Sequence, residues 1–302
     1  MIHGLVVVDK EKGFSSHAVV AQIRGFLKTK RVGHFGTLDP AATGILLIGI
    51  GHATRLFNFY VHKEKTYSGI IRFGYATSTF DAEGVPVSEK MEIDLRNIDL
   101  LPILAQFTGA LLQVPPIFSA KKLKGVPLYK YARKNIAVER KPNQIHIHSL
   151  NHRIIDPSAL GFEAVTSSGT YIRSLAHDIG QKIGVGAFLE ELKRERIGEF
   201  DIPRSHRIET IARHVADGRF DKVILPFESL LPEFSKIIVT AGGRRGVTNG
   251  VSLSAADVLK IIPAPDTEHF RIFDEEGHFL AIARKDRSMS FRPCIVFPDE
   301  NS

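Results

Sequence analysis

VGHFGTLDPAATG, the run of residues 32–44, is the stretch of sequence that does most to decide the fold and the function. It holds one carboxylate, Asp39, inside a turn made of glycines and a proline. Gly36 and Gly44 permit backbone angles that other residues resist, and Pro40 fixes the chain just after the acid. An acid held by the backbone in this way suits nucleophilic or general-base chemistry. The alternative is that Asp39 caps a short helix beginning at Pro40.

The composition indicates a folded protein with a basic surface. With 302 residues and 43% hydrophobic content, the chain can bury a large core and is expected to form a large and a smaller domain. Its 40 lysines and arginines exceed its 33 acidic residues, which gives a formal net charge of +7 and a pI near 9.4. This excess predicts a polyanionic partner such as nucleic acid, with a membrane surface as the weaker alternative.

Several features favour a cytoplasmic protein without a metal or a cofactor. Cys294 is the single cysteine, so no disulfide can form within the chain, and no paired Cys/His spacing predicts a zinc site. Residues 1–10 are typical of a strand rather than a secretion signal. The apolar run at residues 45–50 is far shorter than the ~20 residues that cross a bilayer. Nucleotide-binding loops, dinucleotide fingerprints and zinc-protease motifs are absent from the sequence.

Two segments in the first third of the chain have clear periodic patterns. In residues 65–73, alternation places Tyr67, Ile71 and Phe73 on one face of a strand, so Tyr67 is predicted to face inward. Helical spacing of apolar residues predicts a helix over residues 100–107.

The segment 115–141 carries the densest group of basic residues in the chain. Eight cations accompany a single acid, Glu139, and Phe118, Tyr129 and Tyr131 lie between them. Such a surface can neutralise phosphates and offer flat faces to unpaired bases. The alternative is a solvated helix with its lysines pointing outward. The cations are Lys121, Lys122, Lys124, Lys130, Arg133, Lys134, Arg140 and Lys141.

Further strands and helices are predicted in the next eighty residues. Residues 144–150 and 162–167 have strand patterns, and a helix is predicted over residues 170–183. Arg173 lies off the apolar stripe of that helix. An arginine near a helix amino terminus gains nothing from the helix dipole, so its position predicts a specific anionic partner, with a chance surface arginine as the alternative. A second helix is predicted over residues 187–196.

Short strands separated by glycine-rich turns are predicted for the last part of the chain, and we interpret them as a separate small β domain. One such turn is expected at residues 242–246. The domain is basic, so it is expected to extend a nucleic-acid footprint. Its basic residues include Arg244, Arg245, Arg284, Lys285 and Arg287.

Taken together, these segments resemble a known family. Residues 33–44 are similar to the active-site motif of the TruB family of tRNA pseudouridine synthases, which isomerise uridine 55 in the T loop. Four further blocks agree with that family in order, and the likeness runs from about residue 2 to residue 200. They are Asp9-Lys10 with Gly13 and Ser15-Ser16, Lys65-Thr66-Tyr67, Pro115-Pro116 with Ser119-Ala120-Lys121 and Tyr129 to Arg133, and Gly169 to Leu175 with Leu192.

The sequence departs from the family pattern at a few positions. Glu11 stands where proline is usual, Phe35 replaces threonine, Ala41 replaces leucine and Phe118 replaces tyrosine. In residues 77–79 the family prefers an aspartate. None of these changes removes a position that the resemblance makes catalytic, but Phe35 and Ala41 are expected to alter the packing around the turn.

The resemblance implies an α+β fold, with a mixed, largely antiparallel sheet flanked by helices and a small β-rich, PUA-like domain. We expect the catalytic domain to span residues 1–232, with an RNA-gripping insertion at about 115–141, and the small domain to span residues 233–302. The implied activity flips uridine 55 out of the tRNA T loop and moves its glycosidic bond from N1 to C5. We expect a cytoplasmic monomer that needs no cofactor, metal or obligatory protein partner and does not bind membranes.

The resemblance also implies a set of site residues. Asp39 is expected to act as nucleophile or base, and Arg173 to hold its carboxylate ionised and aimed. Tyr67 is expected to stack on the extruded uracil and to help the proton leave C5, and Leu192 to exclude water from the pocket. The predicted RNA contacts are His34, Lys10, Lys65, Lys121, Lys122, Tyr129 and Arg133.

Two other hypotheses remain at the level of the sequence. A noncatalytic RNA-binding or RNA-folding protein could keep the same fold and clamp tRNA. A guide-RNA-dependent member of the same superfamily would work with partner proteins. The sequence also leaves open whether Asp39 attacks uracil C6, attacks the sugar or removes a ribose proton.

Overall fold

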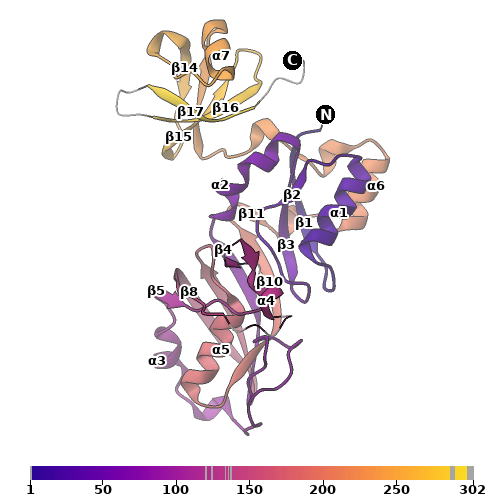
Figure 1. The fold of residues 1–302 in the computed structure, drawn as a ribbon, viewed down its shortest axis with the longest axis vertical. Helices are drawn as coiled ribbons and strands as arrows, with labels where there is room; N and C mark the ends of the chain where they lie inside the picture. Colours follow the sequence, from indigo (N-terminus) through magenta and orange to yellow (C-terminus); the bar gives the residue numbers. More distant parts are fainter. Residues whose placement is uncertain are drawn as a thin grey trace.

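A computed structural model describes residues 2–119, 121–123, 125–132, 134, 136, 138–285 and 290–297. The molecule is elongated, with one large sheet along most of its length and a second sheet at the end that holds the carboxyl terminus (Figure 1). This arrangement agrees with the expected α+β class.

The large sheet has ten strands, and its main order is β12-β1-β3-β10-β4-β9-β8-β5, with β2 paired to β3 and β11 to β10. Among the described strands of this sheet, β3 and β10 form the parallel pair and all other pairs are antiparallel. The strands are β1 (Gly4–Lys10), β2 (Val32–His34), β3 (Thr43–Ile50), β4 (Lys65–Phe73), β5 (Gly109–Gln113), β8 (Asn143–Asp156), β9 (Ala159–Thr166), β10 (Ala187–Ile197), β11 (Phe200–Asp201) and β12 (Leu225–Pro226).

Helices cover the two halves of this sheet differently. Residues of α1 and α6 pack with Val6 and Val8 of β1, whereas residues of α5 and α3 pack with Tyr67 and Ile71 of β4 (Figure 1). The helices are α1 (Ser16–Leu27), α2 (Phe57–Val61), α3 (Leu100–Ala105), α4 (Leu128–Ala132), α5 (Ile172–Ile183), α6 (Ile208–Ala216) and α7 (Ala241–Thr248). Short 3-10 helices are η1 (Gly51–Leu56), η2 (Leu95–Asn97), η3 (Ile202–Arg204), η4 (Phe220–Lys222), η5 (Phe227–Ser229) and η6 (Ala255–Asp257).

Strand β1 shows why the sheet has apolar residues on both faces. Val6 and Val8 join the core under α1 and α6, and the alternating Leu5 and Val7 join a core on the other side. A strand buried on both faces has a continuous apolar run instead of an alternating pattern. The predicted inward side of β4 is confirmed, because Tyr67, Ile71 and Phe73 are all buried.

The second sheet has five strands in the order β14-β13-β15-β16-β17. The predicted domain boundary between residues 232 and 233 lies just before its first strand. Helix α7 contributes Val247 to the core of this sheet. The strands are β13 (Phe234–Val239), β14 (Val258–Ile262), β15 (Asp266–Phe273), β16 (Phe279–Lys285) and β17 (Phe291–Val296).

Two predictions of secondary structure are wrong. Residues 187–197 form strand β10 instead of a helix, because this segment lies between β3 and β4 in the middle of the sheet and pairs with both. The glycine-rich turn expected at residues 242–246 lies inside helix α7. Thr240 caps that helix by accepting the Gly243 N–H, and a Cβ at Gly243 would lie 2.8 Å from the Asp257 carbonyl oxygen.

The basic segment 115–141 is mostly irregular where the structure describes it. It contains a two-stranded hairpin of β6 (Lys122–Leu123) and β7 (Val126–Pro127), followed by the five-residue helix α4. The alternative of one solvated helix is therefore wrong for the described residues of this segment.

Candidate active site

The loop that carries Asp39 connects β2 to β3 and is held by backbone contacts. No helix begins at Pro40, so the capping alternative is wrong; the Ala42 N–H closes a turn on the Asp39 carbonyl at 3.1 Å. Ser16 holds the backbone of Leu38, the residue before Asp39. Its hydroxyl accepts the Leu38 N–H at 2.9 Å and donates to the Leu38 carbonyl at 3.0 Å.

Arg194 supports the same loop from inside the protein. Its Nε donates to the Ile45 carbonyl at 2.7 Å, and its Nη atoms donate to the Thr37 carbonyl at 3.1 Å and the Gly36 carbonyl at 3.2 Å. The side chain is fully buried. Sequence reasoning missed this residue because it placed Arg194 on a helix. Had residues 187–197 been predicted as a central strand, an arginine in it would have indicated a buried charge, and a buried charge needs hydrogen-bond partners.

Two lysines predicted to contact RNA lie inside the protein instead. Lys10 is 1% exposed, and its ammonium donates to the carbonyls of Glu11, Phe14 and Pro40. Burial lowers its pKa to about 8, against the opposing effect of the Asp39 charge. Lys65 is also buried, donates to two carbonyls, and has its pKa lowered to about 8 by burial and Arg194. We therefore reassign Lys10 from RNA contact to support of the Asp39 loop, whereas Lys65 lines the cavity beside Asp39 and stays a predicted RNA contact.

Arg173 and Asp39 form the ion pair that the family resemblance implies. Arg173 lies in the first turn of α5 and is 7% exposed, and its Nε is 2.9 Å from Asp39 Oδ2. Its Nη2 donates to the Phe118 carbonyl at 2.8 Å. The Asp39 side chain keeps 40% of its surface exposed. The pair thus joins a buried guanidinium to a carboxylate that solvent or a ligand can reach.

A second carboxylate, Asp81, binds the same guanidinium and was not predicted. Its Oδ2 lies 3.3 Å from Arg173 Nη1, which also donates to the Thr79 carbonyl at 3.2 Å. Phe80, which lies between Thr79 and Asp81, has a left-handed backbone with a φ of 64°. Its ring stacks on that of His177 in α5, with 3.8 Å between the ring centroids. A left-handed phenylalanine is rare and strained, and such strain is common near functional sites. Asp81 lies two residues after positions 77–79, the region where the family prefers an aspartate.

A cavity of about 370 Å³ opens beside Asp39, within the size range of small-ligand pockets. Tyr67 of β4 and Leu192 of β10 line it together with Asp39 and Arg173, so the four predicted catalytic residues meet at one cavity. Tyr171 lines it too, and burial raises the pKa of its phenol.

The remaining predicted RNA contacts differ in burial, and the structure describes only some of their side chains. His34 in β2 is partly buried; burial, His17 and Arg194 lower its pKa to about 4, so it is neutral at pH 7. The Lys121 ammonium lies 2.5 Å from Asn143 Oδ1. The side chains of Lys122 and Tyr129, and the whole of Arg133, lie outside the described part of the chain.

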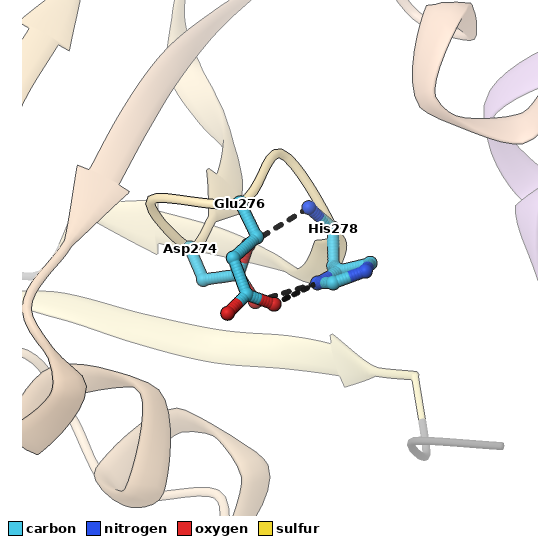
Figure 2. Close-up of side chains that lie close together, drawn as sticks. All are labelled: Asp274, Glu276 and His278. Carbon is cyan, nitrogen blue, oxygen red and sulfur yellow. Dashed lines mark hydrogen bonds and ion pairs between the residues drawn. The ribbon is translucent and has the colours of Figure 1, made fainter. Parts of the chain in front are cut away.

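One group in the described part of the chain has the residue types of a metal site. The possible ligand atoms of Asp274, Glu276 and His278 lie within 4.8 Å of one another in the turn between β15 and β16 (Figure 2). Asp274 Oδ2, however, already accepts from His278 Nδ1 and Arg244 Nη1, each at 2.9 Å. The Asp274 carboxylate raises the pKa of His278, whereas a metal ligand must be neutral. These residues fit an ion-pair cluster better than a metal centre.

Comparison with solved structures identifies the fold. The chain aligns over 99% of its length with 86% of a chain in a structure of an H/ACA RNP bound to a substrate RNA containing 2'-deoxyuridine, with a TM-score of 0.73 and 21% identity. It aligns equally fully with 87% of a chain in the archaeal box H/ACA sRNP Nop10–Cbf5 complex, with a TM-score of 0.73 and 22% identity. The chain therefore shares the fold of those two chains.

Family comparisons are more specific. Residues 24–172 match the TruB family pseudouridylate synthase (N terminal domain), and residues 173–232 match the tRNA pseudouridylate synthase B C-terminal domain. The tRNA pseudouridine synthase B of Solibacter usitatus is 39% identical over an alignment that covers 97% of this chain and 99% of the relative. The tRNA pseudouridine synthase B of Thermotoga petrophila is 37% identical over 100% of this chain and 96% of the relative. The chain belongs to the TruB family of tRNA pseudouridine synthases. No helix in the described residues has the length and apolar character needed to span a membrane.

Proposed function

We propose that this chain isomerises uridine 55 in the T loop of tRNA to pseudouridine, with the base flipped into the cavity beside Asp39. The observation that carries the proposal is the 2.9 Å ion pair between Arg173 and Asp39 at the wall of that cavity. Flipping costs a few kcal/mol of stacking, and contacts made only by the extruded base must offset that cost. Tyr67 supplies such a contact, because its ring is held in the sheet and lines the cavity.

The reaction detaches uracil from the ribose and rejoins it through another atom. The bond from N1 to the ribose C1' breaks, the base turns, a bond from C5 to C1' forms, C5 loses its proton and N1 gains one. Asp39 provides the nucleophile or base that starts this sequence, and Arg173 keeps its carboxylate ionised and aimed. Tyr67 assists the departure of the C5 proton, and Leu192 keeps water from the detached ring.

RNA affinity comes from surfaces outside the cavity in this proposal. The basic segment 115–141 grips the T stem-loop through phosphates and shape, as readers of RNA loops do. The PUA-like sheet of residues 234–296 extends the same footprint. His34 offers a neutral imidazole beside the target, and the chain works as a monomer without a protein partner.

Release of tritium from tRNA labelled at uridine C5 tests the proposal directly. The purified chain should release one tritium for each uridine converted, and Asp39→Asn should abolish release while tRNA binding persists. Equal pseudouridine yield from Asp39→Asn would overturn the assignment of Asp39. An inactive wild-type chain that still binds tRNA would instead favour the noncatalytic RNA-binding hypothesis.

A bare tRNA transcript separates this function from guide-dependent modification. The chain alone should convert that transcript, and a transcript with cytidine at position 55 should give no product. A requirement for a guide RNA or a second protein would place the chain with the guide-dependent members of the superfamily.

A further inference from the structure

Gln113, the last residue of the edge strand β5, makes an unusual contact with the start of α5. Its side chain is 4% exposed, its Oε1 accepts the Tyr171 N–H at 2.8 Å, and its Nε2 donates to the Tyr171 carbonyl at 3.0 Å. One amide therefore pairs with both backbone polar groups of a single residue, as a neighbouring strand would. Tyr171 is the N-cap residue of α5 and makes no side-chain cap bond of its own.

The segment after Gln113 runs beside the first turn of α5 and accepts hydrogen bonds from its side chains. Ser174 donates from its hydroxyl to the Val114 carbonyl at 2.8 Å, and Arg173 Nη2 donates to the Phe118 carbonyl at 2.8 Å. These two bonds depend on side chains of α5, whereas the Gln113 bonds fix the helix backbone itself. Tyr171 lies two residues before Arg173, so the position of its backbone determines where the Arg173 side chain leaves the helix.

We propose that Gln113 is a positioning residue for pseudouridine formation, because it fixes the backbone of Tyr171 and thereby aims Arg173 at Asp39. The inference rests on the proposed role of the Arg173–Asp39 pair. Without the Gln113 amide, the Tyr171 N–H loses its partner and the Tyr171 carbonyl keeps only the Leu175 N–H at 3.1 Å, so the first turn of α5 is free to shift. A small displacement of a catalytic pair has a large effect on rate and a smaller effect on binding.

Two variants test the inference with different readouts. Gln113→Leu removes both bonds and should lower kcat about tenfold or more while KM for tRNA changes less than about threefold. In Gln113→Glu, an ionised carboxylate still accepts the Tyr171 N–H but repels its carbonyl, whereas a protonated carboxyl donates to that carbonyl. The kcat of Gln113→Glu relative to wild type should therefore rise as the pH falls from 9 to 6, with the midpoint raised by burial.

Tyr60→Phe is a matched control for the loss of a buried side-chain hydrogen bond to the backbone. The Tyr60 hydroxyl accepts the Leu231 N–H at 3.2 Å, and the residue is 0% exposed. This variant should lose stability without losing kcat. A Gln113→Glu variant whose kcat relative to wild type does not change with pH, or a folded Gln113→Leu variant with wild-type kcat, would overturn the inference. Failure of the proposed function would differ, because the wild-type chain would then be inactive.

Discussion

At the scale of the residue, Arg173 is the side chain on which the candidate site most depends. Its guanidinium binds two carboxylates, those of Asp39 and Asp81, and the carbonyls of Thr79 and Phe118. Arg173→Ala should lower the single-turnover rate by about 100-fold or more, since the Asp39 carboxylate is no longer oriented and Asp81, with 14% of its side chain exposed, loses its charge partner. The Kd for tRNA, measured by filter binding, should change little.

Arg72→Ala is the matched control for this prediction, because Arg72 also bridges two carboxylates, Asp156 and Glu190, outside the cavity. It should leave the single-turnover rate close to that of wild type. An Arg173→Ala enzyme with unchanged turnover would show that the ion pair has no part in the reaction.

His34 gives a pH-dependent prediction at the same scale. Burial lowers its pKa from the usual 6.5 to about 4, so between these values the unfolded chain binds more protons at this residue than the folded chain. The free energy of unfolding should therefore rise with pH across this window, and His34→Gln should remove up to about 1.4 kcal/mol per pH unit of that slope. Urea unfolding at several pH values measures it.

His278 provides a control of opposite sign for the His34 experiment. Asp274 raises the pKa of His278, so its stabilising contribution is present below pH 6.5 and is lost as the pH rises through the folded pKa. Above pH 6.5, His278→Gln should therefore remove a fall of stability with pH, and it should leave the slope between pH 4 and 6.5 unchanged. Equal slopes for wild type and His34→Gln would mean that His34 is not held neutral in the folded protein.

At the scale of the element, the sequence predicts strands that have a clear alternation or a short continuous apolar run, and it fails at β10, whose apolar spacing also fits a helix. Strand β4 was predicted because its inward face alternates with a half-exposed one. Strand β10 carries Leu189 and Leu192 at a spacing that a helix also permits, and its pairing with β3 and β4 is a long-range property. That error hid Arg194. Asp39 and Arg173 were predicted because local turn chemistry and helix position single them out, whereas Asp81 becomes visible only when its loop packs against α5.

Gly44 tests how tightly the Asp39 loop is coupled to β10. Its φ is 97°, and a Cβ there would lie 2.3 Å from the Arg194 carbonyl oxygen. Gly44→Ala should destabilise the protein by about 2–4 kcal/mol and lower kcat, because either the loop or β10 must move. Gly33→Ala is the control, since Gly33 has an ordinary φ and nothing within 4 Å of an added Cβ. Equal unfolding midpoints for the two variants would contradict the coupling.

At the scale of the whole molecule, the two sheets share one hydrophobic core. Leu5 and Leu47 of the large sheet belong to the same buried cluster as Phe279 and Ile282 of β16. Phe227 of η5 stacks on Phe279 at 4.8 Å between ring centroids. Lys63 adds ion pairs to Glu199 at 2.6 Å and Glu233 at 2.7 Å, on either side of the connection. An interface this apolar should hold the sheets as one body.

Calorimetry can test whether the sheets unfold together. We expect one transition for the whole chain, with its calorimetric and van't Hoff enthalpies equal.

Phe270 lies in the separate core of the second sheet, so Phe270→Ala should destabilise that sheet by about 3–5 kcal/mol. If the sheets are one cooperative unit, it should also reduce the hydrogen-exchange protection of β9 in the large sheet by the same free energy. Leu112→Ala is the control, because Leu112 is 76% exposed. Two transitions, or lost protection confined to β13–β17, would mean that the shared core permits the second sheet to unfold alone.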